Sequence, residues 1–293
     1  IKLPDWPQFH NTPTRRIKGR FDELSKIRKY KASIPDWLDE LGLKELGNLW
    51  EEEIYAQNET APVILRANRL ETDRDELIKS LADENIYAQP VKGLKDAIKL
   101  NERADVFKTE TFKKGWFEVQ DASSQMVAEL LKPQPGMRII DTCAGAGGKT
   151  LHLASLMQNK GQIIALDIYR KKLLELKRRA KRAKAFNVET RPIENNKVIK
   201  KLHNSADAVL IDAPCSGLGV LRRNPDAKWK LTPEFIDKIQ KTQQDILQAY
   251  SKLLKPKGIL VYATCSILPS ENTKQVQKFL NSEAGQNFKL LKE

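Results

Sequence analysis

Apolar residues after about residue 115 gather in short runs that are separated by longer amphipathic segments. The short runs predict strands over 137–141, 162–167, 188–193, 208–212 and 259–264. Apolar residues at three- and four-residue spacing predict helices over 151–157, 170–185 and 233–254. Thr232 and Pro233 suit the cap and first position of the last helix. Strands that alternate with helices of this length predict an α/β fold, with a parallel sheet covered by helices on both faces.

The first third of the chain has a different pattern. Residues 63–66 alternate like a strand, 72–75 resemble a capping box that opens a helix, and a second short strand is expected near 86–91. These elements predict a small α/β module. We therefore expect three parts: a basic N-terminal arm or helices over 1–32, the module over 33–112, and a larger domain over 113–293.

Charge points to a polyanionic partner. Lys and Arg total 51 against 38 Asp and Glu, a formal net charge of +13, which favours RNA or DNA. No apolar run approaches the ~20 residues that cross a bilayer, and no signal peptide is present, so we expect a cytoplasmic protein without a membrane partner. The chain starts at Ile1, and 288–293 read as the start of another strand. We therefore expect a fragment of a longer chain.

The cysteines are odd in number and widely spaced. Cys143, Cys215 and Cys265 include no Cys-x-x-Cys pair, so neither a disulfide nor a structural zinc is expected. Each follows an apolar run and stands among small or turn-forming residues, which is typical of a site on a loop. We expect no metal, and a monomer.

A glycine-rich turn, 141–150, follows the first strand of the larger domain. Its spacing is not the Walker pattern, despite its Gly148-Lys149-Thr150 ending, because the earlier glycine is misplaced. Ligands of parallel sheets bind at the carboxyl ends of the strands. Asp167 ends the second strand, about 20 residues beyond the turn, where an acid suits the two hydroxyls of a ribose. Together they predict an adenosine-containing cofactor, either a dinucleotide or S-adenosylmethionine.

Two further strands end in unusual chemistry. Asp212-Ala213-Pro214-Cys215-Ser216-Gly217 supplies an acid, a rigid proline and a thiol, and Thr264-Cys265-Ser266 supplies a second thiol. A dehydrogenase needs none of these, so we consider hydride transfer the least favoured chemistry. Two thiols and a carboxylate should meet beside the cofactor.

At this point the sequence resembles a known family. Residues 115–281 are similar to the RNA cytosine-C5 methyltransferases of the Fmu/Sun/NSUN family, the bacterial RsmB type especially. The matching stretches are Val119 to Gln125, the glycine turn, Asp212 to Gly217, Arg222 to Trp229, Tyr262 to Ser266 and Ser270 to Asn272. Residues 34 to about 110 resemble the family's small RNA-recognition-like domain more loosely. The resemblance implies a Rossmann-like, doubly wound class I methyltransferase sheet after that domain.

The resemblance also implies roles for the residues of the site. Cys265 would add to carbon 6 of cytosine and so activate carbon 5. Cys215 would help release the enzyme, Asp212 would bond the pyrimidine edge near N3, Pro214 would fix the loop, and Lys149 would lie near the base. S-adenosylmethionine would be held by Cys143, Ala144, Gly145, Ala146, Gly147, Gly148, Lys149, Asp167 and Asp212. The target base must leave its stack, so single-stranded or flipped RNA is expected, ribosomal RNA above all.

The chain departs from the family pattern at two places. Gly145-Ala146 replaces an Ala-Pro pair in the turn, and the adenine-side acid after the third strand is represented only by Glu194. Arg222 and Arg223, directly after the catalytic loop, are the expected RNA contacts. The basic helix 170–185 is more typical of a solvated back face than of an RNA contact. Trp229 could stack on a base or fill the core, and we favour the core.

Three alternatives remain open. Cys215 could be the nucleophile, as the Pro-Cys thiol is in DNA cytosine-C5 methyltransferases, although the second thiol argues against it. A transfer RNA could replace ribosomal RNA as substrate. A catalytically idle RNA-binding or ribosome-assembly factor could use the same fold, although Asp212, Cys215 and Cys265 are all present.

Overall fold

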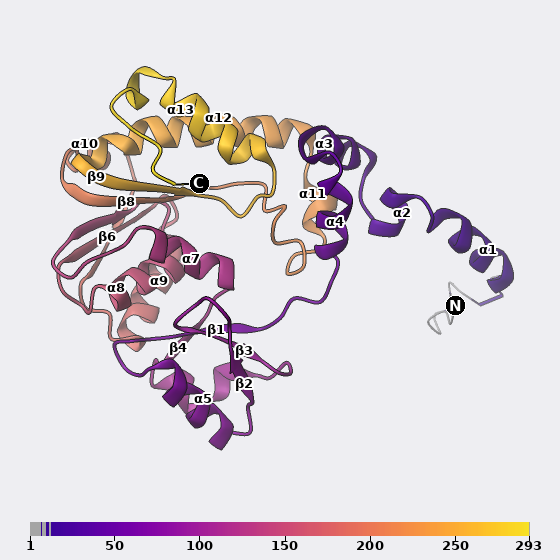
Figure 1. Ribbon diagram of the computed structural model, residues 1–293, viewed down its shortest axis with the longest axis horizontal. Coiled ribbons are helices and arrows are strands. Elements are labelled where there is room, and N and C mark those ends of the chain that lie inside the picture. The colour runs from indigo at the N-terminus through magenta and orange to yellow at the C-terminus, as the bar shows by residue number, and fades with distance from the viewer. Residues whose placement is uncertain (1–6, 8–9, 12, 293) are drawn as a thin grey trace.

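A computed structural model describes residues 7, 10–11 and 13–292 (Figure 1). Its helices and 3₁₀ turns that lie before the large sheet are α1 (Thr14–Leu24), α2 (Arg28–Ala32), α3 (Asp36–Leu46), α4 (Leu49–Ala56), α5 (Arg74–Asp83), η2 (Val106–Lys108), α6 (Glu110–Lys113) and α7 (Ala122–Leu130). None of the described helices has the length and apolar character that crossing a bilayer requires.

The small module is an antiparallel sheet with helices against it. Its strands run in the order β2-β3-β1-β4, namely β2 (Ala88–Pro90), β3 (Ala97–Leu100), β1 (Ile64–Ala67) and β4 (Phe117–Val119). Leu65, Ile98 and Phe117 from three strands pack with Leu77 and Leu81 of α5. β3 and β4 were not expected from the sequence. Because β4 pairs with β1, a boundary at residue 112 would cut it from its own sheet, and we propose to divide the chain after Val119.

The expected parallel sheet is present. Five strands run in the order β7-β6-β5-β8-β9, with every pairing parallel, namely β7 (Val188–Pro192), β6 (Gln162–Asp167), β5 (Arg138–Asp141), β8 (Ala206–Asp212) and β9 (Leu254–Ala263). The remaining elements are α8 (Gly148–Leu156), α9 (Arg170–Arg182), α10 (Asn196–Lys200), α11 (Ala227–Lys230), α12 (Pro233–Tyr250), η3 (Ser251–Leu253), η4 (Pro269–Glu271), α13 (Thr273–Leu280) and η5 (Glu283–Gly285).

Alternate side chains of these strands enter two separate cores. Ile139, Ile163 and Leu210 pack against α7, α8 and α9 on one face. On the other face, Ile140 and Ile211 pack against α10, α12 and α13. A strand covered on both faces reads as a continuous apolar run rather than an alternating one, and this is why the sequence located β5, β6 and β8. The helix predicted over 233–254 ends at Tyr250, and β9 begins at Leu254, five residues before the predicted start.

The N-terminal helices do not join the small sheet. Trp50 and Ile54 of α4 pack with Leu38 of α3 and with Leu218 and Leu268, which flank the cysteine loops of the large domain. Figure 1 shows α3 and α4 beside α11, while α1 extends away from the rest of the molecule. α2 packs on these helices, with Ala32 buried in the same cluster and Arg28 bonded to Asp39 at 2.8 Å. The helices therefore support the two cysteine-containing loops from outside the sheet.

The C-terminal strand expected over 288–293 is not formed. Residues 288–292 have no strand pairing, and residue 293 lies outside the described residues. Phe288 instead packs edge-on against Phe279 of α13, with ring centroids 5.2 Å apart.

Candidate active site

The polar residues expected at strand ends lie at one edge of the large sheet. Asp141, Asp167 and Asp212 are the last residues of β5, β6 and β8, and Cys265 follows the end of β9 by two residues. β8 and β9 are neighbours in register, with Asp212 opposite Ala263. The topology therefore brings both cysteine loops to the same place.

The two thiols are in contact. Cys215 Sγ lies 3.1 Å from Cys265 Sγ, and the backbone N–H of Cys265 also donates to Cys215 Sγ at 3.3 Å. The hydrogen bond from the Cys215 thiol lowers the pKa of Cys265, and the same bond raises the pKa of Cys215. Cys265, which is exposed, is thus the sulfur that ionises first. This is the property that a nucleophile requires.

A cation and a carboxylate stand beside the sulfur pair. Lys149 Nζ, from the first turn of α8, lies 2.6 Å from Asp212 Oδ2. The positive charge of Lys149 lowers the pKa of Cys265, while the negative charge of Asp212 raises it. Both side chains are largely shielded from solvent, where a charge acts more strongly than in bulk water.

The Cys215 loop is fixed from behind by a buried carboxyl group. Glu271, which is fully buried, accepts hydrogen bonds from the Ser216 N–H at 2.9 Å and from the Ser216 hydroxyl. Gln243 of α12 donates to Glu271 Oε1 at 3.2 Å and to the Pro214 carbonyl at 3.0 Å. The residues on both sides of Cys215 are thereby held to α12 and η4.

Removing one thiol should change the acidity of the other. In the Cys215→Ala variant, Cys265 loses the donor that is the largest cause of its lowered pKa, while burial and Asp212 still raise it. We expect the midpoint of Cys265 alkylation by iodoacetamide, followed over pH by mass spectrometry, to move to higher pH. Cys143 serves as the internal control, because burial raises its pKa to about 12 and should keep it unlabelled. An unchanged or lower midpoint would contradict this arrangement.

The glycine turn before α8 has the open backbone that close ligand approach needs. Gly145 and Gly147 have φ values of +55° and +87°, a region that favours glycine. A Cβ on Gly147 would lie 2.0 Å from a methyl carbon of Leu176, whereas one on Gly145 would meet nothing within 4 Å. Gly147 therefore packs against α9, and Gly145 faces open space.

Asp167 stands beside this open space. Its Oδ2 accepts from the Gly145 N–H at 2.8 Å, and its Oδ1 accepts from the Tyr169 N–H at 2.7 Å. Each carboxylate oxygen can accept a further hydrogen bond. The N–H groups of Gly148 and Lys149, at the start of α8, have no backbone acceptor within the described part of the chain. Acceptors for hydroxyls beside free donors suit an adenosine-containing cofactor.

Two arginines that the sequence analysis missed hold the turn in place. Arg66, buried in β1, donates to the Gly148 carbonyl at 2.8 Å, and Arg179 of α9 donates to the Ala146 carbonyl at 2.9 Å. Arg179 also binds Glu118 of β4 at 2.8 Å. Burial lowers the pKa of Arg66 to about 10. An arginine within the apolar run 63–67 was the available signal, since a buried cation requires partners.

The other candidates lie at the margins of the site. Glu194 is exposed between β7 and α10. Arg223 is ion-paired with Asp121 and donates to the Pro62 carbonyl at 2.9 Å, and Arg222 lies 4.0 Å from Glu59. Both arginines therefore tie their loop to the N-terminal part of the chain.

The expectation that Trp229 fills the core is wrong. It is 57% exposed on α11, whose neighbour Lys228 is buried instead. Lys228 donates to the Ala32 carbonyl at 3.1 Å and to Asn58 at 3.1 Å. Two acceptors compensate this buried ammonium group, which turns the indole outward.

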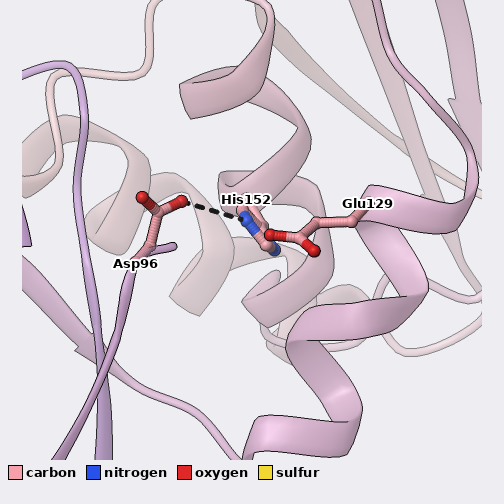
Figure 2. A group of neighbouring side chains, drawn as sticks. All are labelled: Asp96, Glu129 and His152. Atoms are coloured by element: carbon pink, nitrogen blue, oxygen red, sulfur yellow. Dashed lines mark ion pairs between the residues drawn. The ribbon is translucent and has the colours of Figure 1, made fainter. Parts of the chain in front are cut away.

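A second cluster of titratable groups lies between the small sheet and the large domain (Figure 2). Asp96, Glu129 and His152 place their ligand-type atoms within 4.8 Å of one another, with His152 Nε2 3.7 Å from Asp96 Oδ2. Burial and the charge of Arg66 lower the pKa of His152 to about 4, and Arg69 binds Asp96 at 2.6 Å. With two guanidinium groups beside it, the cluster disfavours an added cation, and we assign it to the contact between domains.

Comparison with known proteins matches both domains. A family model described as "16S rRNA methyltransferase RsmB/F" matches residues 128–292, and a model for the ferredoxin-like domain of RsmF/B-like methyltransferases matches residues 34–107. A methyltransferase homologue from Pyrococcus horikoshii has 30% identity and a TM-score of 0.77, over 87% of this chain and 81% of that one. The fold is thus a ferredoxin-like domain followed by a class I methyltransferase sheet.

Similar proteins include ribosomal RNA small subunit methyltransferases B, of which this chain spans about 56–67% of the length. Ribosomal RNA small subunit methyltransferase B of Serratia proteamaculans is 36% identical over 288 residues, which cover 97% of this chain and 67% of that protein. The protein of the same name from Photorhabdus laumondii is 37% identical over 84% of this chain and 57% of its own length. A Synechocystis relative, 39% identical, is also covered over only 56% of its length.

Proposed function

The chain belongs to the RsmB/F family of 16S rRNA methyltransferases, and on this premise we propose that it methylates carbon 5 of a cytosine in ribosomal RNA. The cofactor of the reaction is S-adenosylmethionine. The observation that carries the proposal is the contact between Cys215 and Cys265, 3.1 Å apart at the ends of adjacent loops. A methyltransferase that acts on a nucleophilic atom of its substrate needs neither thiol, whereas carbon 5 of cytosine has to be activated.

Cys265 acts first in the proposed reaction. Its thiolate adds to carbon 6 of the flipped base, and the electron pair of the carbon 5–carbon 6 bond becomes available at carbon 5. Asp212, which is ion-paired with Lys149, would share a proton with N3, and Lys149 would stabilise the remaining charge that develops on the pyrimidine. S-adenosylmethionine, when bound, supplies the methyl group to carbon 5 and leaves as the neutral thioether.

Cys215 acts second. Once the Cys265 sulfur is covalently bonded to carbon 6, it carries no negative charge. The hydrogen bond from the Cys215 thiol to the Cys265 thiolate, which raises the pKa of Cys215, is then lost. Cys215 can then help remove the proton from carbon 5. The electron pair of that C–H bond restores the carbon 5–carbon 6 double bond and expels Cys265 as thiolate. Pro214, through its carbonyl bond to Gln243, keeps Cys215 within reach.

The cofactor would be held at the glycine turn. Backbone groups from Cys143, Ala144, Gly145, Ala146, Gly147, Gly148 and Lys149 line it, Asp167 would accept from the ribose hydroxyls, Glu194 would approach the adenine and Asp212 the methionine end. Arg222 and Arg223 follow the loop of Cys215 and could contact RNA that enters the site beside this loop.

Product analysis tests this function. The protein is incubated with 16S rRNA or transfer RNA and labelled S-adenosylmethionine, and the RNA is digested to nucleosides. We expect labelled 5-methylcytidine from 16S rRNA and little from transfer RNA. Labelled 5-methylcytidine from transfer RNA alone would show that transfer RNA, and not 16S rRNA, is the substrate. No label in either RNA, together with no heat of cofactor binding by calorimetry, would favour the idle assembly factor.

A further inference from the structure

A basic hollow lies where the small domain meets helix α9, away from the cysteines. It has a volume of about 590 Å³ and is lined by Lys113, Lys114, Trp116, Arg178, Lys181, Arg182, Lys184 and Glu71. Six of the eight lining side chains are cations and one is an acid. The family resemblance and the strand-end chemistry assign no role to this surface.

Much of the charge remains uncompensated. Glu118 neutralises Arg179 and Arg182, Glu71 pairs with Lys184, and Glu110 and Glu175 pair with Lys113 and Arg178 in exposed ion pairs. Seven cations thus face four acids. Lys181 has no ion pair among the described residues, and Lys114 lies over the Trp116 ring at 5.5 Å. Exposed pairs contribute little free energy, so a phosphate could replace their acids.

The floor of the hollow is rigid. Gly115 packs so closely on α9 that a Cβ there would lie 2.0 Å from the Arg182 carbonyl oxygen. Asn68 donates to the carbonyls of Gly115 and Ala183, both at 2.9 Å. The small domain and α9 therefore present their cations at fixed relative positions, which is what a binding site needs and a solvated helix face lacks.

We propose that this hollow binds the sugar-phosphate backbone of the RNA substrate, remote from the target base, with the half-buried Trp116 in its lining. The inference rests on the proposed function for RNA as the ligand class. Positive side chains interleaved with an aromatic ring are typical of single-stranded nucleic-acid sites.

The position of the hollow makes it an anchor rather than a part of the catalytic centre. α9 starts three residues after Asp167 and runs back from the carboxyl edge of the sheet. At 1.5 Å per residue, Arg178 to Arg182 lie roughly 12–18 Å along the helix from its start. Only an RNA longer than the flipped nucleotide and its neighbours can occupy both places.

Salt-dependent binding tests the inference. Affinity of the full chain for a fluorescent 16S rRNA fragment is measured by anisotropy at several salt concentrations. The Lys114→Ala/Lys181→Ala variant removes two cations that line the hollow. The control variant Lys177→Ala/Lys200→Ala removes two exposed lysines that do not line the hollow. Both lose the same net charge.

We expect the Lys114→Ala/Lys181→Ala variant to weaken RNA binding by about tenfold and to reduce the slope of log affinity against log salt concentration by about 2. The control variant should change the affinity and the slope by much less. In the Lys114→Ala/Lys181→Ala variant, kcat at saturating RNA should stay unchanged, and so should the rate of methylation of a short oligonucleotide that contains the target.

Equal effects of the two variants on RNA affinity would overturn the proposal that the hollow binds RNA. Wild-type protein that binds a polyglutamate chain as tightly as the RNA fragment would point to an acidic protein partner and overturn it too. Failure of the proposed function would appear separately, as wild-type protein that yields no 5-methylcytidine.

Discussion

In a denaturing gel of the protein mixed with labelled 16S rRNA and S-adenosylmethionine, the Cys215→Ala variant should accumulate an RNA-linked band, and Cys265→Ala should form none. In the proposed mechanism Cys265 is the nucleophile, and its pKa is lowered by the thiol that would be removed in the first variant. The adduct should still form without Cys215, because Lys149 continues to favour the thiolate, but its release should be slow. Turnover in Cys265→Ala should fall by about 10⁴-fold or more.

An exposed residue outside the site supplies the control. Glu283 lies in η5, so Glu283→Gln should leave the band pattern of the wild type. A band that persists in Cys265→Ala and disappears in Cys215→Ala would reverse the two roles and assign the nucleophile as in DNA cytosine-C5 methyltransferases. The gel thereby separates two mechanisms that share the same residues.

The polar residues at the ends of the parallel strands could be predicted from the sequence, because buried parallel strands stand out as short apolar runs. β6 spans the residues expected for it, and Asp167 and Asp212 end their strands as predicted. Helix bounds were less accurate: α8 begins at Gly148, three residues before the apolar spacing indicated. The first turn lies over the glycine-rich segment, whose small residues give no periodic pattern.

The small domain was only partly predictable. β3 and β4 have four and three residues, too few for alternation to stand out. Their pairing with β1 spans dozens of residues, and no local pattern reports such a contact. The same reason hides Arg66 and Arg179, whose acceptors in the glycine turn are distant in sequence. Trp229 was placed in the core by residue type, whereas the acceptors of Lys228 decide which face of α11 is buried.

Glu271→Gln should impair the release step and lower stability together. The side chain is fully buried, and both of its oxygens accept, from the Ser216 N–H, the Ser216 hydroxyl and Gln243. An amide keeps the shape, but its NH₂ group either faces the Ser216 N–H and the Gln243 amide, which are both donors, or replaces Oε2 and removes the acceptor of the Ser216 hydroxyl. One buried group left unsatisfied costs about 1–3 kcal/mol, which urea denaturation would measure as a lower free energy of unfolding.

The kinetic consequence should fall on Cys215 more than on Cys265. Glu271 bonds the Ser216 loop directly and reaches the Cys265 loop only through the Ser216 hydroxyl, which donates to the Ser266 hydroxyl at 3.2 Å. The Cys265 loop has a further bond that does not involve Glu271, from Asn272 to the Ser266 carbonyl at 2.8 Å. A displacement of about 1 Å at a reacting group can cost about 10²-fold in rate. We therefore expect the Glu271→Gln variant to form the RNA adduct at a near-normal rate and to release it about 10- to 100-fold more slowly. Glu283→Gln, at an exposed residue of η5, should change neither rate nor stability. If adduct formation slows as much as release, Glu271 supports both cysteine loops, because a carboxyl group that mainly orders the Cys215 side would leave the addition step intact.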